Sequence, residues 1–391
     1  MGFPAADPFD AGPFAHWLRP GMWHTVRRAV LAAAVAWLPL ALLAAVQGHL
    51  AHPSPRESLL HDLTAYARYL VAVPAFVLAE GLTLPVLGAI VREFVNAGIV
   101  PANERPRYDA VVASVRRLLA HRGVQAGLLV LAYGLAIQSL LLGPRHAVWR
   151  VVGTDEWIAP LVGGERRLSL AGWWAMLVSQ PIFLLLVAMW LWRVLVWTRF
   201  LWGMSRLDLK LVAAHPDRAG GLYFVSTSLR AFALVAFPLG AAVAGVIAEE
   251  TVDLDRPLAE LRAMALAACA AIVLLFVLPL VVFAVPLARA RVRAVFAYGN
   301  LAATLGRAFE ARWLDRDTAV TDEALSVQDF SATTDLYAIT DNVAKMRLLP
   351  LGIWPVLTLA FGAALPMLLV SLASVTVARV LEVLRMVVLG R

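Results

Sequence analysis

Residues 171–192 read AGWWAMLVSQPIFLLLVAMWLW and contain no charged side chain. Tryptophan pairs mark both ends, with Trp173 and Trp174 at one and Trp190 and Trp192 at the other. On a helix that rises about 1.5 Å per residue, these pairs lie roughly 24–28 Å apart. That distance matches the spacing of two aromatic belts on one bilayer, so the segment is expected to span a membrane.

The composition of the whole chain also indicates a membrane protein. Of its 391 residues, 61% are hydrophobic and 16% are charged, whereas soluble domains have about 45–50% and about 25%. The net charge is +7, but no basic run is dense enough to track phosphates. We attribute the positive charge to membrane anchoring and expect no nucleic-acid partner. A single cysteine, Cys269, excludes an intrachain disulfide and a cysteine-based metal site.

Further apolar runs predict an all-α protein, a polytopic transmembrane helical bundle of about seven spans, with six as the alternative. The expected spans are residues 29–47, 69–91, 124–142, 171–192, 229–247, 263–287 and 351–377. A tail at 1–28 precedes them, and an amphipathic tail at 378–391 follows. The last span holds two prolines, so it either crosses or re-enters. The fifth span has a face of small residues that lets helices approach closely: Gly240, Ala241, Ala244 and Gly245.

Arginine and lysine are concentrated in alternate connectors. By the positive-inside rule, this bias places the N-terminus and the connectors after the second, fourth and sixth spans in the cytoplasm. Those three spans are expected to continue as helices past the membrane and to return through cytoplasmic hairpins at 92–123, 193–228 and 288–350. Within the first hairpin, residues 104–122 are predicted to form an amphipathic helix near the membrane surface.

The densest polar stretch is HPDRAGGL at residues 215–222, between the fourth and fifth spans. One interpretation is a structural corner, in which the Pro after His215 ends the preceding helix, Asp217 closes a turn, and Gly220 and Gly221 adopt positive φ. A second is a binding or gating site, in which Arg218 and glycine N–H groups hold an anion and His215 titrates. The third is acid–base chemistry by His215 and Asp217.

Glu80 is the one acidic residue well inside an apolar run. A carboxylate at that depth is costly, so it pairs with Arg193 or another arginine of the bundle, snorkels, or lies on an ion pathway. Gln138 and Gln180 are uncharged polar residues at similar depth. Such side chains either hydrogen-bond a neighbouring helix or line a pore. We therefore take Glu80, Gln138, Gln180 and Arg193 as pathway candidates.

The sequence offers little for metal or cofactor chemistry. His49, His52 and His61 with Asp62 lie in the first connector, but nearby prolines oppose helical spacing and no HExxH frame is present. Nucleotide-binding and hydrolase motifs are also absent from the sequence. We predict no metal, no cofactor and no catalytic residue.

The HPDRAGGL run follows a helix rich in Trp and Arg, and a second block, MRLLPL at residues 346–351, leads into the last span. Together these blocks resemble a group of uncharacterised bacterial integral membrane proteins. The resemblance covers roughly residues 170–375. It implies a bacterial inner membrane and no catalytic residues.

The leading functional prediction is a channel or transporter for a small ion or solute, working as a homo-oligomer in the lipid bilayer. It rests on Glu80, the proline-containing spans and the small-residue faces. The alternative is a non-transporting sensor or scaffold that binds a cytoplasmic partner through residues 294–350. A membrane-embedded enzyme is the third and least favoured class.

Overall fold

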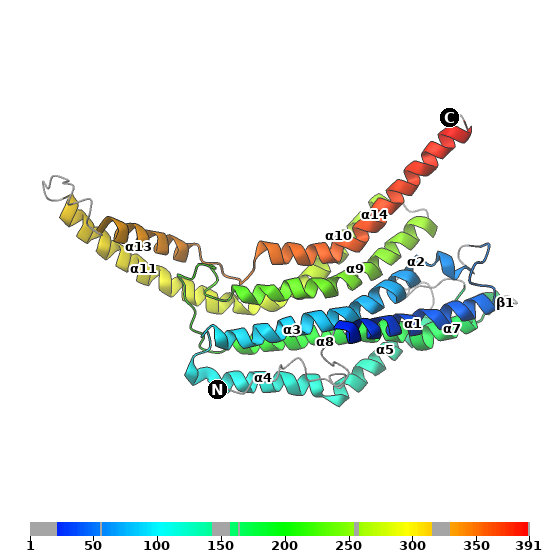
Figure 1. Ribbon diagram of the computed structural model, residues 1–391, viewed down its shortest axis with the longest axis horizontal. Coiled ribbons are helices and arrows are strands. Elements are labelled where there is room, and N and C mark those ends of the chain that lie inside the picture. Colours follow the sequence, from blue (N-terminus) through cyan, green and yellow to red (C-terminus); the bar gives the residue numbers. More distant parts are fainter. Residues whose placement is uncertain are drawn as a thin grey trace.

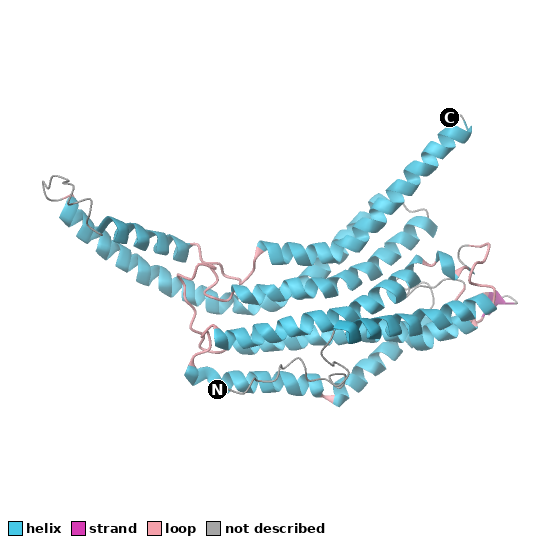
Figure 2. Ribbon diagram, in the orientation of Figure 1, coloured by secondary structure: helices cyan, strands magenta, loops and turns pink. Residues whose placement is uncertain are grey.

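The computed structural model describes residues 22–54, 57–142, 157–162, 165–253, 258–314 and 329–389. In these residues the chain is almost wholly helical (Figure 2), and the only strands are β1 (Leu161–Val162) and β2 (Glu165–Arg166), paired antiparallel. The prediction of an all-α bundle is therefore confirmed. Most of the expected N-terminal tail lies outside the described residues.

Long helices run side by side along the length of the molecule (Figure 1). The α-helices are α1 (Met22–Val46), α2 (Leu63–Ala65), α3 (Val73–Asn96), α4 (Arg105–Ala120), α5 (Arg122–Leu142), α7 (Leu170–Trp174), α8 (Gln180–Ser205), α9 (Thr227–Asp253), α10 (Leu258–Val277), α11 (Ala284–Trp313), α13 (Asp329–Ala344) and α14 (Ile353–Leu389). Short 3-10 segments are η4 (Leu59–His61), η6 (Ala102–Glu104), η8 (Tyr223–Ser226) and η9 (Leu278–Phe283). Two π-helical segments are η5 (Tyr66–Ala72) and η7 (Ala175–Ser179).

Six helical stretches in the described residues are long and apolar enough to cross a membrane. A bent pair, Ala102–Ala120 with Arg122–Gln138 at 46°, raises the number to seven if it forms one further span. The chain is thus a multi-pass membrane protein, and the expectation of about seven spans with six as the alternative is confirmed.

Three of these stretches exceed the bilayer. Leu63–Asn96, Leu170–Ser205 and Leu261–Trp313 have 34, 36 and 53 residues. At about 1.5 Å per residue they measure roughly 51, 54 and 80 Å, against about 30 Å of hydrocarbon. These stretches contain the expected second, fourth and sixth spans, and each is longer than one direct crossing requires.

The connector after the fourth span differs from the helical hairpin expected at 193–228. α8 ends at Ser205, and the chain to Leu222 is irregular. Its backbone does not continue a helix: Lys210 N–H donates to Ile99 O, in the turn after α3, at 2.9 Å, and Val212 N–H donates to Gly220 O, within the connector, at 3.2 Å. The connector therefore packs on the turn after α3.

α4 packs along α8, in contrast to the surface-lying helix expected at 104–122 (Figure 1). Its Tyr108 hydroxyl donates to Val91 O of α3 at 2.8 Å, and Val115 is fully buried. Val111 approaches so closely that a Cβ on Gly203 of α8 would lie 2.8 Å from it. The apolar positions of α4 thus face α3 and α8.

Two helix ends also differ from expectation. α1 begins at Met22 and includes Arg28, which was placed in the tail. The helix accommodates this arginine because a carboxylate of α3 meets it inside the bundle. α14 runs without interruption from Ile353 to Leu389, past the start expected for the C-terminal tail at 378. The side chains of that tail lie outside the described residues.

α9 lies at the centre of the bundle, and its glycines set how closely its neighbours approach. A Cβ on Gly240 would lie 2.1 Å from Ala363 O of α14, and one on Gly362 of α14 would lie 2.7 Å from Ala233 O of α9. On the other side, a Cβ on Gly245 would lie 2.6 Å from the Ala67 side chain. The small-residue face expected on the fifth span is thus confirmed as a packing surface on both sides.

A cluster of four phenylalanine rings joins the helices next to the irregular connector. Phe94 of α3 lies with its ring centroid 5.9 Å from Phe200 of α8, 5.0 Å from Phe224 of η8 and 6.2 Å from Phe283 of η9. Because these rings are large and their stacking is directional, they fix the relative positions of the four segments. The HPDRAGGL stretch is attached to this platform.

Candidate functional site

Three charged side chains from three spans meet inside the bundle. Glu80 of α3 is 5% exposed. Its Oε1 accepts a hydrogen bond from Nη2 of Arg193 on α8, and its Oε2 lies 3.4 Å from Nη2 of Arg28 on α1. The pairing of Glu80 with Arg193 confirms the predicted ion pair, and Arg28 adds a second partner. We call this set the Arg28–Glu80–Arg193 triad.

Aromatic and backbone contacts hold the triad in place. The Arg193 guanidinium lies 4.9 Å from the ring centroid of Trp190, one turn earlier on α8. The Trp190 indole in turn donates from Nε1 to Phe76 O of α3 at 3.2 Å. A cation over an aromatic face gains roughly 0.5–2 kcal/mol, more when it is desolvated. The triad thus links α1, α3 and α8 by charge, and Trp190 supports the same α3–α8 contact.

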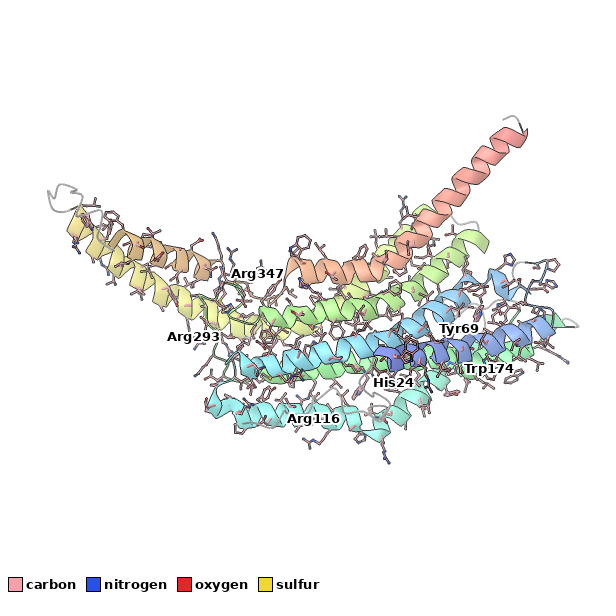
Figure 3. All side chains as sticks on the ribbon, in the orientation of Figure 1. His24, Tyr69, Arg116, Trp174, Arg293 and Arg347 are labelled. Carbon is pink, nitrogen blue, oxygen red and sulfur yellow. The ribbon has the colours of Figure 1, made fainter. Side chains whose placement is uncertain are left out.

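A second buried polar group, the Tyr69–Gln180 cluster, lies further along the same helices, where both π-helical segments occur. Tyr69 of η5 donates its hydroxyl to Oε1 of Gln180 at 3.2 Å, and Gln180 directly follows η7. Ser179, the last residue of η7, donates to Ala36 O of α1 at 2.7 Å. Tyr69 lies within the bundle (Figure 3). π-Helical turns are rare and frequently occur at functional sites.

The Tyr69–Gln180 cluster has two further features that bear on function. Gln180 is 1% exposed, and its Nε2 has no hydrogen-bond partner among the described residues. The neighbouring Arg68 is 2% exposed, with its guanidinium 6.0 Å from the ring centroid of Phe183. A buried amide N–H without a partner costs roughly 1–3 kcal/mol. Such a group is suited to a transient polar ligand.

The four pathway candidates predicted from the sequence thus lie in three different places. Glu80 and Arg193 form one site, and Gln180 lies in the other. Gln138 lies on the exposed side of α5, and no contact among the described residues joins it to Glu80. The bent α4–α5 pair places this part of α5 at the edge of the bundle.

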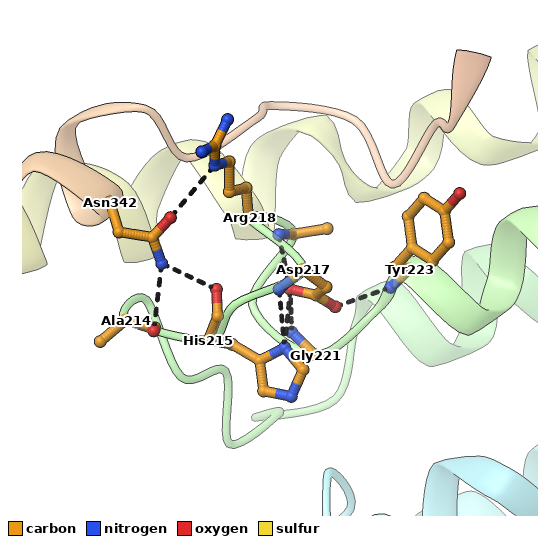
Figure 4. A network of polar contacts seen from close by, with 8 residues as sticks. Ala214, His215, Asp217, Arg218, Gly221, Tyr223 and Asn342 are labelled. Carbon is orange, nitrogen blue, oxygen red and sulfur yellow. Dashed lines mark hydrogen bonds and ion pairs between the residues drawn. The ribbon is translucent and has the colours of Figure 1, made fainter. Parts of the chain in front are cut away.

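The HPDRAGGL stretch folds around Asp217 (Figure 4). Its Oδ1 accepts the N–H groups of Ala219 at 2.8 Å and Gly221 at 3.2 Å, and its Oδ2 accepts that of Tyr223 at 3.1 Å. Arg218, Gly220 and Gly221 have φ values of 56°, 66° and 92°. These backbone amides point to an internal carboxylate, an arrangement that supports the structural-corner interpretation.

His215 contacts the same carboxylate. Its Nδ1 lies 2.9 Å from Asp217 Oδ1 and 3.3 Å from the Asp217 backbone N. A protonated Nδ1 donates to the carboxylate, whereas a neutral ring with a bare Nδ1 accepts from the N–H. Either form of the imidazole therefore keeps a partner within the corner.

The corner also binds the chain that leads into α14. Arg218 donates from Nε to Oδ1 of Asn342 at 3.1 Å, and Asn342 Nδ2 donates to the carbonyls of Ala214 and His215, each at 3.2 Å (Figure 4). Arg347 N–H donates to Arg218 O at 2.7 Å. A Cβ on Gly220 would lie 3.2 Å from Met346 Cε. The two sequence blocks that carry the family resemblance are thus in direct contact.

Hydrogen bonding lowers the pKa of Asp217. Burial alone would raise the pKa, but N–H donation from Ala219, Tyr223 and Gly221, with a contribution from His215, outweighs burial. A carboxyl whose folded-state pKa is depressed contributes stability that is present above its usual pKa of 3.8. That stability is lost as the pH falls through the lower folded value.

We expect Asp217→Ala to loosen the corner by roughly 2 kcal/mol, because three backbone N–H groups lose a charged acceptor. Hydrogen exchange of residues 217–223 measures this directly. In the wild-type protein, protection corrected for intrinsic rates is expected to hold above about pH 5 and to fall below about pH 4. Asp208→Ala, in the same connector, is the control. Unchanged protection in Asp217→Ala would show that the glycine conformations alone hold the corner.

Sequence reasoning missed four residues of these sites. Arg28 and Arg68 lie at the edges of apolar runs and were assigned to a tail and a connector. Tyr69 is the first residue of the expected span at 69–91, and Asn342 lies within the expected hairpin at 288–350. The sequence does contain one signal for Arg28. This arginine lies within one helical turn of an apolar run, and the buried acid Glu80 needs a positively charged partner.

Among the described residues, no three His, Cys, Asp or Glu side chains lie close enough together to hold a metal ion. Comparison with protein-family models, with curated proteins and with solved structures found no match. The candidate sites therefore rest on their geometry.

Proposed function

We propose that the protein is a channel or transporter that moves a small ion or solute across the bacterial inner membrane as a homo-oligomer, with its N-terminus in the cytoplasm. The observation that carries the proposal is the Arg28–Glu80–Arg193 triad. Ionisable groups within membrane spans are costly to insert, and ion and substrate pathways are among the functions that they mark. The arginine bias of alternate connectors supports the orientation.

The Tyr69–Gln180 cluster extends this pathway towards the other end of the spans. Both sites lie between α1, α3 with η5, and α8 with η7. A permeating species loses water of hydration when it enters the spans. Contacts with the charges of the triad and with the unpartnered amide of Gln180 would replace that water. Because buried charges of both signs lie along these helices, either a cation or an anion could be the permeating species. The flux measurement therefore includes both.

Flux into reconstituted liposomes tests the proposal. The informative variant replaces all three triad residues with methionine (Arg28→Met, Glu80→Met, Arg193→Met), because a buried ion cluster replaced as a unit by apolar side chains commonly leaves stability unchanged or improved. We expect wild-type protein to pass K⁺, Na⁺, H⁺ or Cl⁻, or a small neutral solute. The folded triple variant is expected to fall to the level of empty liposomes.

Glu93→Met, near the end of the same α3 helix, is the control and is expected to keep wild-type flux. Size-exclusion profiles establish that each variant is folded. A folded triple variant with undiminished flux would remove the triad from the pathway. Wild-type liposomes impermeable to every tested species would remove transport altogether.

A sensor or scaffold is the second candidate, because one part of the fold projects from the bundle. The outer half of α11 and α13 form an antiparallel pair that extends away from the spans (Figure 1), here called the α11–α13 arm. Phe330 holds the pair, with its ring 5.0 Å from Phe309 and 5.2 Å from Trp313. Tyr337 of α13 is exposed on the arm. Exposed aromatics are enriched where proteins bind partners.

A photoreactive residue at position 337 tests this second function in intact cells. We expect one discrete adduct with another protein if the arm binds a partner. The same probe at Val212, exposed in the irregular connector, is expected to give none. Equal adducts from both positions, or none from either, would contradict the scaffold role, and an adduct with another copy of this chain would indicate self-association through the arm.

A further inference from the structure

A basic groove lies where α11 leaves the bundle. It forms between α4, the connector after α8 and the start of α11, with a volume of about 320 Å³. Its charged lining is Arg107, Arg206, Asp208, Arg289 and Arg293. A second hollow of about 580 Å³ shares Asp208, Arg289 and Arg293 and adds the apolar Ala288 and Val292. Figure 3 shows Arg293 at this end of α11. The groove thus combines basic and apolar side chains.

Of the four arginines that line this groove, only Arg107 makes an ion pair with a carboxylate in the described part of the chain. Arg107 already has a partner, with Nη1 at 3.0 Å from Glu104. Arg206 lies over the Trp202 ring at 4.9 Å. Arg289 and Arg293 make no ion pair with a carboxylate in the described part of the chain. They stand four residues apart on one face of α11, and like charges at that spacing repel. An external anion would relieve this repulsion.

Exposed apolar side chains lie one helical turn from the groove. Trp202 of α8, four residues before Arg206, is 45% exposed, and Val285 of α11, four residues before Arg289, is 56% exposed. Exposed apolar side chains beside a basic groove can contact the acyl chains of a bound lipid. Exposed apolar groups on one side and unpaired arginines on the other are the arrangement that an amphipathic lipid requires.

We propose that this groove binds the headgroup of an anionic phospholipid. The guanidinium groups of Arg206, Arg289 and Arg293 hold the phosphate, for which their fork of donors is well matched. Asp208, next to them, accepts a hydrogen bond from a hydroxyl of the headgroup. Ala288 and Val292 contact the start of the acyl chains. Basic pockets at the ends of transmembrane helices are known to bind such headgroups.

Titration of the detergent-purified full-length protein with phosphatidylglycerol, followed by the shift in melting temperature, tests the proposal. The double variant Arg289→Gln with Arg293→Gln is expected to need about thirtyfold more lipid for half-maximal shift, since each basic residue near an anionic surface contributes roughly fivefold. The matched control is Arg117→Gln with Arg307→Gln, which removes the same charge from exposed positions on α4 and α11. Its half-maximal concentration is expected to stay within about twofold of wild type.

Two further ligands identify the source of the anion. Phosphatidylcholine, which carries no net charge, is expected to give no saturable shift, and neither is soluble glycerol phosphate at the same concentration. An equal shift with glycerol phosphate would overturn the lipid assignment in favour of a soluble anion. Equal weakening in both double variants would show that binding follows net charge and not this groove.

Discussion

Replacing Glu80 with alanine should lower the free energy of unfolding by about 3–5 kcal/mol, the largest loss we expect from one side chain of the spans. Arg193 and Arg28 would then be buried without a counter-charge, since their side chains are only 12% and 21% exposed. Removing one member of a buried ion cluster leaves the full desolvation cost of the others. Thermal unfolding followed by tryptophan fluorescence would measure the loss.

Two variants separate the charge effect from loss of volume. Glu93→Ala, near the end of the same helix, is expected to change stability by less than about 0.5 kcal/mol. The triple methionine variant of the triad is expected to recover most of the stability that Glu80→Ala loses, because no charge then remains buried. If Glu80→Ala were as stable as Glu93→Ala, water would have to reach the triad, and the triad could not be a desolvated cluster.

Replacing Gly240 with alanine should destabilise the bundle by about 3 kcal/mol or more, although only one carbon is added. That Cβ would lie 2.1 Å from Ala363 O, and a backbone carbonyl cannot move aside without moving α14. Since α9 touches most other spans, the separation of α9 from α14 would spread through the core. The measurement is the yield and melting temperature of the purified variant.

Gly134→Ala on α5 is the matched control, because a Cβ there would meet nothing within 4 Å. Alanine stabilises an exposed helix position by about 1 kcal/mol relative to glycine. The same substitution is thus expected to act with opposite sign at the two positions. A stable Gly240→Ala protein would mean that α14 has freedom to slide on α9.

Periodicity and composition predict the spans well, because each must be apolar over about 20 residues whatever it packs against. Helix ends beyond the membrane are less predictable, since they depend on neighbours. α8 ends at Ser205 because the following backbone bonds to the turn after α3. α4 leaves the surface because α3 and α8 offer it a protein face.

The same distinction applies to the sites. The partner of Glu80 could be predicted because a lone carboxylate in an apolar run demands a positive charge, and Arg193 was the best-placed arginine. The role of Asp217 as acceptor for three N–H groups required knowledge of the turn geometry. The π-helical segments leave no trace in the pattern of apolar residues, so the contact between Tyr69 and Gln180 could not be foreseen.

The long helix that leaves the spans has a mechanical consequence. η9, with Pro279, interrupts regular hydrogen bonding between α10 and α11, and a 3-10 stretch within a helix often marks a hinge. Beyond it, the 30 residues of α11 form a rod of about 45 Å. A tilt of about 10° at η9 moves the far tip by about 8 Å, given that length. A change of angle at η9 would therefore displace the tip of α11 further than the residues that lie beside the spans.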